Sequence, residues 1–553
     1  MDTPDLYWWR WGAGKPLPLD DYPQLQTMLK AWLDLPNGLE PPASIPLDDV
    51  TLNAPRIDDP VLRSLRRLLP EDAIRTDKLA RAQHACGRSY RNLVCCQRGL
   101  VPNPPDVVVY PADEGQVAGV VAWAADREVA IIPFGGGTSL TNGIEPEPER
   151  HPTVTMDLSR LNHLVSLNTD SWTARIQAGA RGPELEAALN ARGFTLGHFP
   201  HSFECSTLGG WIATRSAGQA ATGYGTIEAL TQAVRMVSPT GILETKNIPA
   251  AATGPSLLHL ALGSEGAYGV ITEATMRVRP QPEAQEYHGV LFHRLTDGLN
   301  ALRDLVQQGT PPTVVSLSDA ADTAVLSMLS HEPQGWRWLA DRGIEAYLSR
   351  RGYAPNGESC LLIVGYEGEA TYVKNLVKQA VATCRTYDGF HLGQAAGESW
   401  KRDRFIQPYL RDTILAMGMM VDTLDTATTW SNAVNLYEVI NAAINAAIPT
   451  CGGGSGHVMT RFGHATPGGI SLTTTFWGRR MPGQEIEQWW EIKQAATEAI
   501  LEAEGTLSHH QGIGRDRVPW LGEEIGPVGM AVLKALKRTL DPEGIMNPGV
   551  LVP

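Results

Sequence analysis

Three consecutive glycines follow an apolar stretch at residues 133–139 (PFGGGTS). Because glycine has no Cβ, such a turn lets the backbone approach a ligand closely, and its N–H groups can form a concave anion site. A pyrophosphate group suits that shape. A tight turn that binds nothing explains an isolated glycine triplet about equally well.

Two more glycine-containing turns lie further along the chain, at residues 201–211 (HSFECSTLGGW) and 263–273 (GSEGAYGVITE). Residues 214–218 (TRSAG) follow the first of these two turns closely. A Rossmann-type nucleotide site is not indicated, because that fingerprint opens a helix and residues 138–143 predict none. The recurrence of such turns favours a ligand site over an empty connection.

A pair of adjacent histidines, His509 and His510, lies on a turn with glycines on both sides. Imidazoles there are poor core fillers, whereas a neutral imidazole beside a reacting centre can accept the proton of a hydroxyl group. We therefore predict that both are catalytic. Arg402 and Arg404 could bind an anionic substrate, but a solvated helix face explains them about as well.

The first turn ends a predicted strand–helix–strand unit. β-Branched and apolar residues predict strands at 106–110 and 130–134, and an apolar periodicity predicts a helix at 114–127. The mixed order of the later elements favours an α+β fold over a simple doubly wound sheet. The later elements are strands at 153–157, 173–178 and 360–366 and helices at 182–192, 370–384 and 528–540. A further helix is predicted before the unit, at 60–69.

Length and composition narrow the class of protein. A chain of 553 residues is too long for one ordinary core, and prolines near residue 281 predict a domain junction. A net charge of −14 argues against nucleic-acid binding. No run approaches the roughly 18 apolar residues of a membrane span, and the N-terminus does not resemble a signal peptide, so a cytoplasmic location is expected. The seven cysteines lack metal-site spacing and are interpreted mainly as buried thiols.

In their order and spacing, the three turns resemble the flavin domain of the vanillyl-alcohol oxidase and p-cresol methylhydroxylase (PCMH) superfamily, over about residues 100–280. The resemblance implies FAD in an extended pose, with its pyrophosphate on the first turn and its isoalloxazine ring facing a cap domain. The positions carried over as cofactor-binding are Pro133, Phe134, Gly135, Gly136, Gly137, Thr138, Ser139, His201, Ser202, Phe203, Glu204, Cys205, Ser206, Thr207, Thr214, Arg215, Ser216, Ala217, Glu265, Gly266, Ala267, Tyr268, Gly269, Val270 and Ile271.

Covalent members of that superfamily attach FAD through a histidine in or near these turns. Thr138 occupies the position after the glycines here, so non-covalent FAD is expected, with His198 and His201 as the covalent alternatives.

Nearly the whole chain is similar to the alkyldihydroxyacetonephosphate synthase family. The matching segments are 9–12 (WRWG), 195–198 (TLGH), 204–215 (ECSTLGGWIATR) and 507–514 (LSHHQGIG). The resemblance implies a two-part PCMH-type FAD-binding domain at 101–280 and an α/β cap domain at 281–500. A helical covering segment at 1–100 would precede them, and a C-terminal segment at 501–553 would return to the flavin site.

The catalytic positions of the synthase family match only in part. Its substrate-activating arginine corresponds to Ser316, and its proton-donating tyrosine corresponds to Gly463 or Phe462. The third member of its histidine triplet corresponds to Gln511, whereas its phosphate-binding arginine has a counterpart in Arg411. Loss of a positioned acid or base alone typically costs ~10²–10⁴-fold in rate.

Residues 461–465 (RFGHA) also resemble a run of the flavin 2-hydroxy-acid dehydrogenases, some of which hold a divalent metal there. His457, His464, His509 and His510 could accordingly serve as base, substrate ligands or metal ligands. His457 and His464 could equally be ordinary hydrogen-bonding residues. No metal is predicted, because the carboxylate ligand and the second motif histidine of those enzymes are missing.

These residues support three functional hypotheses. The first is an FAD-dependent oxidoreductase, an oxidase or dehydrogenase acting on an alcohol or 2-hydroxy acid: hydride goes to the flavin, His509 or His510 takes the proton, and Arg411 anchors an anionic group. The second is an alkylglycerone-phosphate synthase, which is redox-neutral overall. The third is a catalytically inactive flavoprotein with a binding role. The expected partner is a small, anionic substrate; a second copy in a homodimer is also considered, and no nucleic acid is expected.

Overall fold

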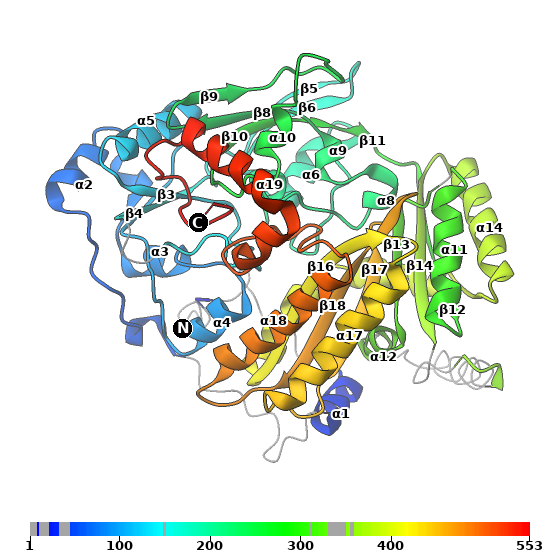
Figure 1. Ribbon diagram of the computed structural model, residues 1–553. Coiled ribbons are helices and arrows are strands. Elements are labelled where there is room, and N and C mark those ends of the chain that lie inside the picture. The colour runs from blue at the N-terminus through cyan, green and yellow to red at the C-terminus, as the bar shows by residue number, and fades with distance from the viewer. Residues whose placement is uncertain are drawn as a thin grey trace.

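The computed structural model describes residues 8–9, 22–32, 45–147, 151–309, 311–329, 350–353 and 359–552. Helices and sheets alternate in mixed order along the chain, so the predicted α+β class is confirmed. Figure 1 shows the smaller sheets on one side, a long sheet with its helices on the other, and the C-terminal segment in red between them. Trp9 is buried, but residues 10–12 of the segment similar to the synthases lie outside the described residues.

The predicted strand–helix–strand unit forms the first sheet. β2 (Val107–Val109), β4 (Thr153–Asp157) and β3 (Ala130–Phe134) are parallel neighbours, and α5 (Glu114–Ala125) makes the crossover from β2 to β3. The strands are almost fully buried, which explains their Val and Ile content. Because β3 ends at residue 134, the glycines begin at the carboxyl edge of the sheet, where open α/β sheets bind ligands.

A second, antiparallel sheet carries the other two turns. α7 (Leu208–Ala213) begins within the second turn, and β10 (Val270–Arg277) begins within the third. Each turn is therefore fixed to a mostly buried element. The sheet runs β5 (Leu164–Asn168), β6 (Thr173–Gln177), β10, β8 (Thr231–Ser238), β9 (Gly241–Glu244).

The long sheet has seven strands, and its helices lie mainly on one face (Figure 1). Side chains alternate between its two faces. Phe462, for example, packs on Tyr437 of a covering helix, whereas its neighbours Arg461 and Gly463 line a cavity on the opposite face. The strand order is β15 (Phe390–Gly393), β12 (Ala284–Phe292), β14 (Cys360–Gly368), β13 (Val314–Ser318), β17 (His457–Gly463), β18 (Gly469–Arg479), β16 (Met419–Thr429).

The helices associated with this sheet include the last long helix of the cap, α18, which packs on α17. They are α11 (Leu295–Gln307), α12 (Ala320–Leu329), α14 (Ala370–Thr386), α15 (Gln394–Asp403), α16 (Gln407–Ala416), α17 (Ala433–Thr450) and α18 (Glu485–Glu502).

The C-terminal segment returns to the first sheet. α19 (Val518–Leu540) is broken at Gly526, whose φ is 70°, just before Pro527. Beyond it the chain runs beside β3: Ile131 N donates to Ile545 O, and Asn547 N donates to Ile131 O, both at 2.9 Å. The predicted return of this segment is confirmed, and the part of α19 beyond the break at Gly526 corresponds to the predicted helix at 528–540.

The remaining elements are short or belong to the N-terminal part. The predicted helix at 60–69 is only Asp59–Leu65, because turns lead into Pro70. Among the described residues, no helix is long and apolar enough to cross a membrane; location and dimerisation stay predictions. The other elements are α1 (Pro23–Trp32), η3 (Leu47–Asp49), α2 (Asp59–Leu65), η4 (Glu71–Ala73), β1 (Ile74–Arg75), α3 (Lys78–Gln83), α4 (Tyr90–Gln97), α6 (Gly182–Asn190), β7 (Phe194–Thr195), α8 (Ala221–Tyr224), α9 (Ile227–Leu230), α10 (Leu258–Ala261) and β11 (Arg279–Pro280).

Candidate functional site

A cavity of about 340 Å³ lies between the three turns and the long sheet. The first turn contributes residues 133–140 to its lining, the second contributes Ser206 and Thr207, and the third contributes Glu265. The opposite wall comes from the cap strands and from the histidine turn after α18. The cavity thus collects every turn that the sequence singled out.

The first turn presents a row of free N–H groups to this cavity. Within the described residues, the backbone N–H groups of residues 135–139 donate to no other protein group. The glycines are required by close packing: a Cβ on Gly136 would overlap the carbonyl group of Cys205, and Gly137 has a φ of +66°. Consecutive unpaired donors in a concave turn suit the oxygens of a pyrophosphate.

Residues near the C-terminus fasten the turns together. The Glu265 carboxylate accepts from Ile513 N at 2.7 Å and from Gly514 N at 2.8 Å. Burial raises the pKa of Glu265 to about 7, although these hydrogen bonds oppose the shift. Asn547 Nδ2 donates to Gly143 O at 2.9 Å and to Glu265 O at 2.6 Å. Sequence reasoning missed Asn547, because nothing local marks a residue that links distant turns.

Most of the predicted cofactor-binding positions line the cavity, and seven do not. Turns and strands send part of their side chains away from a ligand. Arg215 forms an ion pair with Glu228, and Glu204 accepts a hydrogen bond from Tyr409 OH at 2.5 Å. The others pack in the protein interior or beside the second turn. The seven positions are Phe203, Glu204, Cys205, Arg215, Ala267, Tyr268 and Val270.

Arg411 lies in the cap wall of the cavity, on α16. Its Nη1 donates to Arg88 O at 2.7 Å and its Nη2 to Asp422 Oδ1 at 3.3 Å. Asp422 Oδ2 also accepts a hydrogen bond from Lys493 Nζ at 3.0 Å. Burial alone would raise the pKa of Asp422, but Lys493 and Arg411 hold it below its ordinary value. Asp422 therefore pairs with both Arg411 and Lys493 behind the cavity wall.

A second guanidinium lies in the same wall as Ser316. Ser316 pairs with Gly463 across β13 and β17, so two small residues face each other there. Arg461, two residues before Gly463, also lines the cavity and makes two hydrogen bonds with Asp322, at 2.9 and 2.8 Å. Sequence reasoning named Arg461 only as part of a motif and missed its place opposite Ser318, two residues along β13 from Ser316.

The arginines of α15 and its C-terminal end lie elsewhere. Arg402 pairs with the adjacent Asp403 and is largely exposed. The Arg404 guanidinium stacks over Phe199 and Phe405, at 4.5 and 4.8 Å from the ring centroids. Neither lines the cavity, so the solvated-face interpretation fits Arg402 better than substrate binding.

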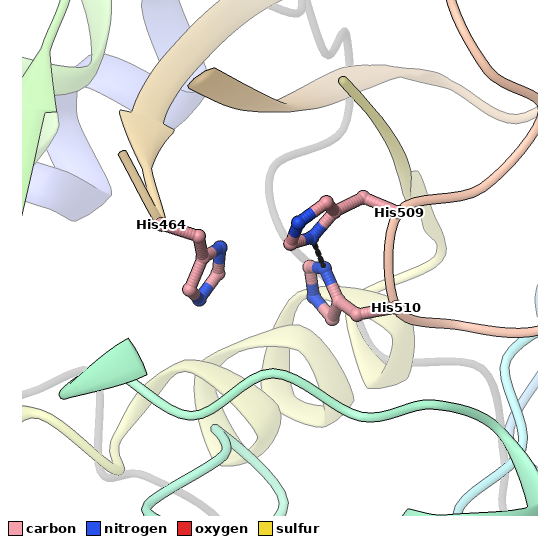
Figure 2. A group of neighbouring side chains, drawn as sticks. All are labelled: His464, His509 and His510. Atoms are coloured by element: carbon pink, nitrogen blue, oxygen red, sulfur yellow. Dashed lines mark hydrogen bonds between the residues drawn. The ribbon is translucent and has the colours of Figure 1, made fainter. Parts of the chain in front are cut away.

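The two predicted catalytic histidines join His464 in a cluster (Figure 2). The ring centroids of His464 and His509 are 5.1 Å apart and stacked, and His464 and His510 meet edge-on at the same distance. His509 Nδ1 and His510 Nδ1 are 3.0 Å apart and share a hydrogen bond. His464 and His510 line the cavity directly, whereas His509 contacts it only through these two rings.

The backbone and a buried carboxylate position this cluster. His464 has a φ of 46°, a left-handed conformation that costs a non-glycine residue about 1 kcal/mol or more. Such strain persists where the surrounding structure demands it, often at functional sites. Asp425, fully buried, accepts from His510 N at 2.6 Å and from Arg517 Nη2 at 3.1 Å. Asp425 therefore holds the histidine turn against the cap.

Burial favours the neutral form of the imidazoles in and beside the cavity. Burial lowers the pKa of His509 to about 4 and that of His201 to about 3. Burial also lowers the pKa of His510, although Asp425 opposes that shift. A neutral imidazole can accept a proton, so this environment favours a base.

Three of the four histidines considered as metal ligands lie close together, and the fourth does not. Ring nitrogens of His464, His509 and His510 lie within 4.8 Å of one another, a spacing that could hold an ion. His457 lies at the far end of β17 and is not in that group. The absence of a bound metal stays a prediction.

The residues present fit FAD. Three buried polar atoms of the lining have no hydrogen-bond partner among the described residues: Thr207 Oγ1, Gln219 Oε1 and Arg411 Nε. A buried polar atom without a partner is costly, so a polar ligand in the cavity would remove that penalty. The free N–H groups of the first turn add donors for the diphosphate.

Comparison with known proteins agrees with this site. The family model for the C-terminal domain of FAD-linked oxidases matches residues 281–551, and that for an FAD-binding domain matches residues 105–246. The alkyldihydroxyacetonephosphate synthase of Dictyostelium discoideum is 32% identical over all of this chain and 90% of its own length.

Two solved structures share the fold. An alkyldihydroxyacetonephosphate synthase structure superposes with a TM-score of 0.82 and 31% identity, over 95% of this chain and 91% of the other. The p-cresol methylhydroxylase structure with substrate bound has a TM-score of 0.66 at 14% identity, over 90% and 98% of the two chains, which shows the fold alone.

Proposed function

The chain belongs to the family of FAD-linked oxidases, with FAD as its cofactor, and from this premise we propose that it exchanges the acyl group of a phosphate-bearing ester for an alkyl group. The proposed substrate is an acyl dihydroxyacetone phosphate. This proposal takes the second hypothesis from the sequence ahead of the first, because the full-length similarity is to a synthase.

The observation that carries the proposal is the division of the cavity wall into charged and apolar parts. Arg411 and Arg461 are its cations, and each also pairs with a carboxylate, Arg411 with Asp422 and Arg461 with Asp322. Apolar cap side chains line the same cavity: Val325, Leu326, Leu329, Ile414, Val421, Met459 and Trp477. An amphiphile with a phosphate head and a hydrocarbon chain matches such a wall better than a small 2-hydroxy acid does, since apolar contact stabilises about 25 cal/mol per Å² buried.

At two positions that depart from the synthase pattern, a residue of the matching type lies nearby in the structure. The resemblance assigns an arginine to the position of Ser316, and Arg461 lines the cavity from the neighbouring strand. The resemblance assigns a third histidine to the position of Gln511, and His464 lies against both His509 and His510. Both functions thus have substitutes within the same wall.

The residues have these roles in the proposed reaction. Arg411 binds the phosphate. His510, neutral and held by Asp425, accepts the proton from the acidic C–H bond beside the substrate ketone. Bound FAD supplies an electron-accepting ring. Overall, the ester C–O bond breaks and a fatty acid leaves, a new C–O bond forms to the oxygen of a long-chain alcohol, and no net oxidation occurs.

Product analysis with the purified FAD-loaded protein tests this proposal. Incubation with acyl dihydroxyacetone phosphate and an isotope-labelled long-chain alcohol should yield labelled ether product and free fatty acid. Absence of both products in active, flavin-loaded protein would refute the exchange reaction.

One observation favours a second candidate, oxidation of a hydroxylated anionic substrate. No tyrosine is among the described residues that line the cavity, so the phenolic donor of the synthases has no substitute there. In this reaction His510 would take the hydroxyl proton while the substrate C–H hydride is transferred to FAD. Anaerobic bleaching of the flavin by an alcohol or 2-hydroxy acid, without ether formation, would select this candidate.

A further inference from the structure

Two thiols face each other outside the cavity. Cys86 Sγ and Cys96 Sγ are 3.6 Å apart, with Cys86 half-buried in a loop and Cys96 buried on α4. All seven cysteines are free thiols. Cys95 is next to Cys96 in the chain, but the contact with Cys86 is made by Cys96.

The loop that carries Cys86 is fastened to the FAD site. Gly87 packs so closely on Ser139 that a Cβ would lie 2.5 Å from the Ser139 carbonyl oxygen. Arg88 N donates to Ser139 O at 2.6 Å, and Arg88 O accepts from Arg411 Nη1 at 2.7 Å. The loop therefore touches both the first turn and the arginine of the proposed phosphate site.

We propose that Cys86 and Cys96 form an oxidisable dithiol site whose disulfide state weakens FAD binding. With hydrogen peroxide as oxidant, the two thiols lose two electrons and two protons, one S–S bond forms, and two waters are produced. The inference concerns the cofactor turn and goes beyond the reaction proposed above.

The environments of the two sulfurs set the order of events. Cys86 is the more accessible one, so peroxide converts its sulfur to a sulfenic acid first. Cys96, adjacent and buried, then displaces the hydroxyl group as the resolving thiol. The hydrogen bond with Cys86 and burial raise the pKa of Cys96, which makes it a poor first target.

In the proposed oxidised state, bond formation pulls the Cys86 loop toward α4. A disulfide has an S–S distance of about 2.05 Å, so the sulfurs approach by roughly 1.5 Å from their present separation. The backbone of Gly87 lies against Ser139, where an added Cβ would be 2.5 Å from the carbonyl oxygen, and the Arg88–Ser139 hydrogen bond is short, so a shift of this loop disturbs the first turn. Loss of one such hydrogen bond predicts about a fivefold rise in the Kd of FAD.

The test uses the full-length, FAD-loaded protein. After peroxide treatment and alkylation, peptide mapping without reductant should show Cys86 linked to Cys96, and dithiothreitol should reverse the link. FAD binding should be about fivefold weaker in the oxidised state, and the affinity should recover on reduction. Cys95→Ser is the matched control and should behave as the wild type, whereas Cys86→Ser should form no link and keep its FAD affinity under peroxide.

Two results would overturn the proposal. One is oxidation of Cys86 to a sulfinic acid, or its linkage to Cys95, with no link to Cys96. The other is a complete Cys86–Cys96 disulfide with unchanged FAD affinity. A Cys96→Ala variant should also form no link, but Cys96 is buried and this variant could fail to fold. In that case Cys86→Ser alone is sufficient for the test, because the half-buried Cys86 tolerates serine more readily.

Discussion

Replacement of Arg411 by methionine separates substrate binding from stability. The side chain lies in the cavity wall, with Nε unpaired and the two Nη atoms bound to Arg88 O and Asp422. Methionine has a similar length and is apolar, so it fills the space without the charge. The expected result is weak binding of an anionic substrate by a protein that still folds.

The contacts of Arg411 set the loss of stability and the loss of substrate affinity in this variant. Asp422 keeps Lys493 Nζ at 3.0 Å and Trp489 Nε1 at 2.8 Å, so no buried carboxylate is left unpaired. The stability cost is therefore about 1–2 kcal/mol rather than the ~3–5 kcal/mol of a broken buried pair. A lost charge-assisted hydrogen bond to substrate phosphate costs about 1.5–3 kcal/mol, which raises the Kd of that substrate roughly 10- to 150-fold.

The assay is titration of the flavin absorption spectrum with dihydroxyacetone phosphate, together with a thermal melt. Arg411→Lys should recover part of the affinity, since the charge is kept but the guanidinium geometry is lost. Arg402→Met is the matched control, because Arg402 is exposed and outside the cavity, and it should bind as the wild type. Wild-type affinity in a folded Arg411→Met protein would refute the role of Arg411.

Three further predictions concern the histidines and the first turn. His510→Ala should lower turnover ~10²–10⁴-fold. The control variant His391→Ala, on the edge strand β15, should turn over substrate as the wild type does. Equal losses of turnover in both variants would contradict the assignment of His510 as the base. Burial lowers the pKa of His201 to about 3, so below about pH 6.5 this side chain binds a proton in the unfolded chain but not in the folded protein. The melting temperature should therefore fall from pH 7 to pH 5. A melting temperature that does not change over this range would argue against the burial of His201. Gly136→Ala should abolish FAD retention on gel filtration, because the added Cβ overlaps the Cys205 backbone, whereas Gly210→Ala, with only Thr207 Oγ1 at 3.5 Å, should retain it. Retention in both variants would mean that the turn can relax.

Local sequence patterns determined the elements and the cofactor turns. The continuous apolar run of β3 and the glycines after it are short-range features, and the strand begins and ends at the predicted residues. Close packing of two backbones excludes Cβ atoms, so a glycine run marks such a site even without a structure. Helix ends were less predictable: the helix predicted at 60–69 ends at Leu65, because turns lead from there into Pro70.

Tertiary structure alone decided which side chains share the cavity. Ser316 and Gln511 suggested lost catalytic groups, because a sequence comparison considers each position by itself. Strand pairing places Arg461 opposite Ser318, two residues along β13 from Ser316, and chain reversal between β17 and β18 carries His464 to the histidine turn some 45 residues later in the chain. The sequence by itself thus determined the fold class and the FAD turns through local backbone constraints. The charged and imidazole groups of the cavity were decided by long-range packing, since their contacts join residues that no local pattern connects.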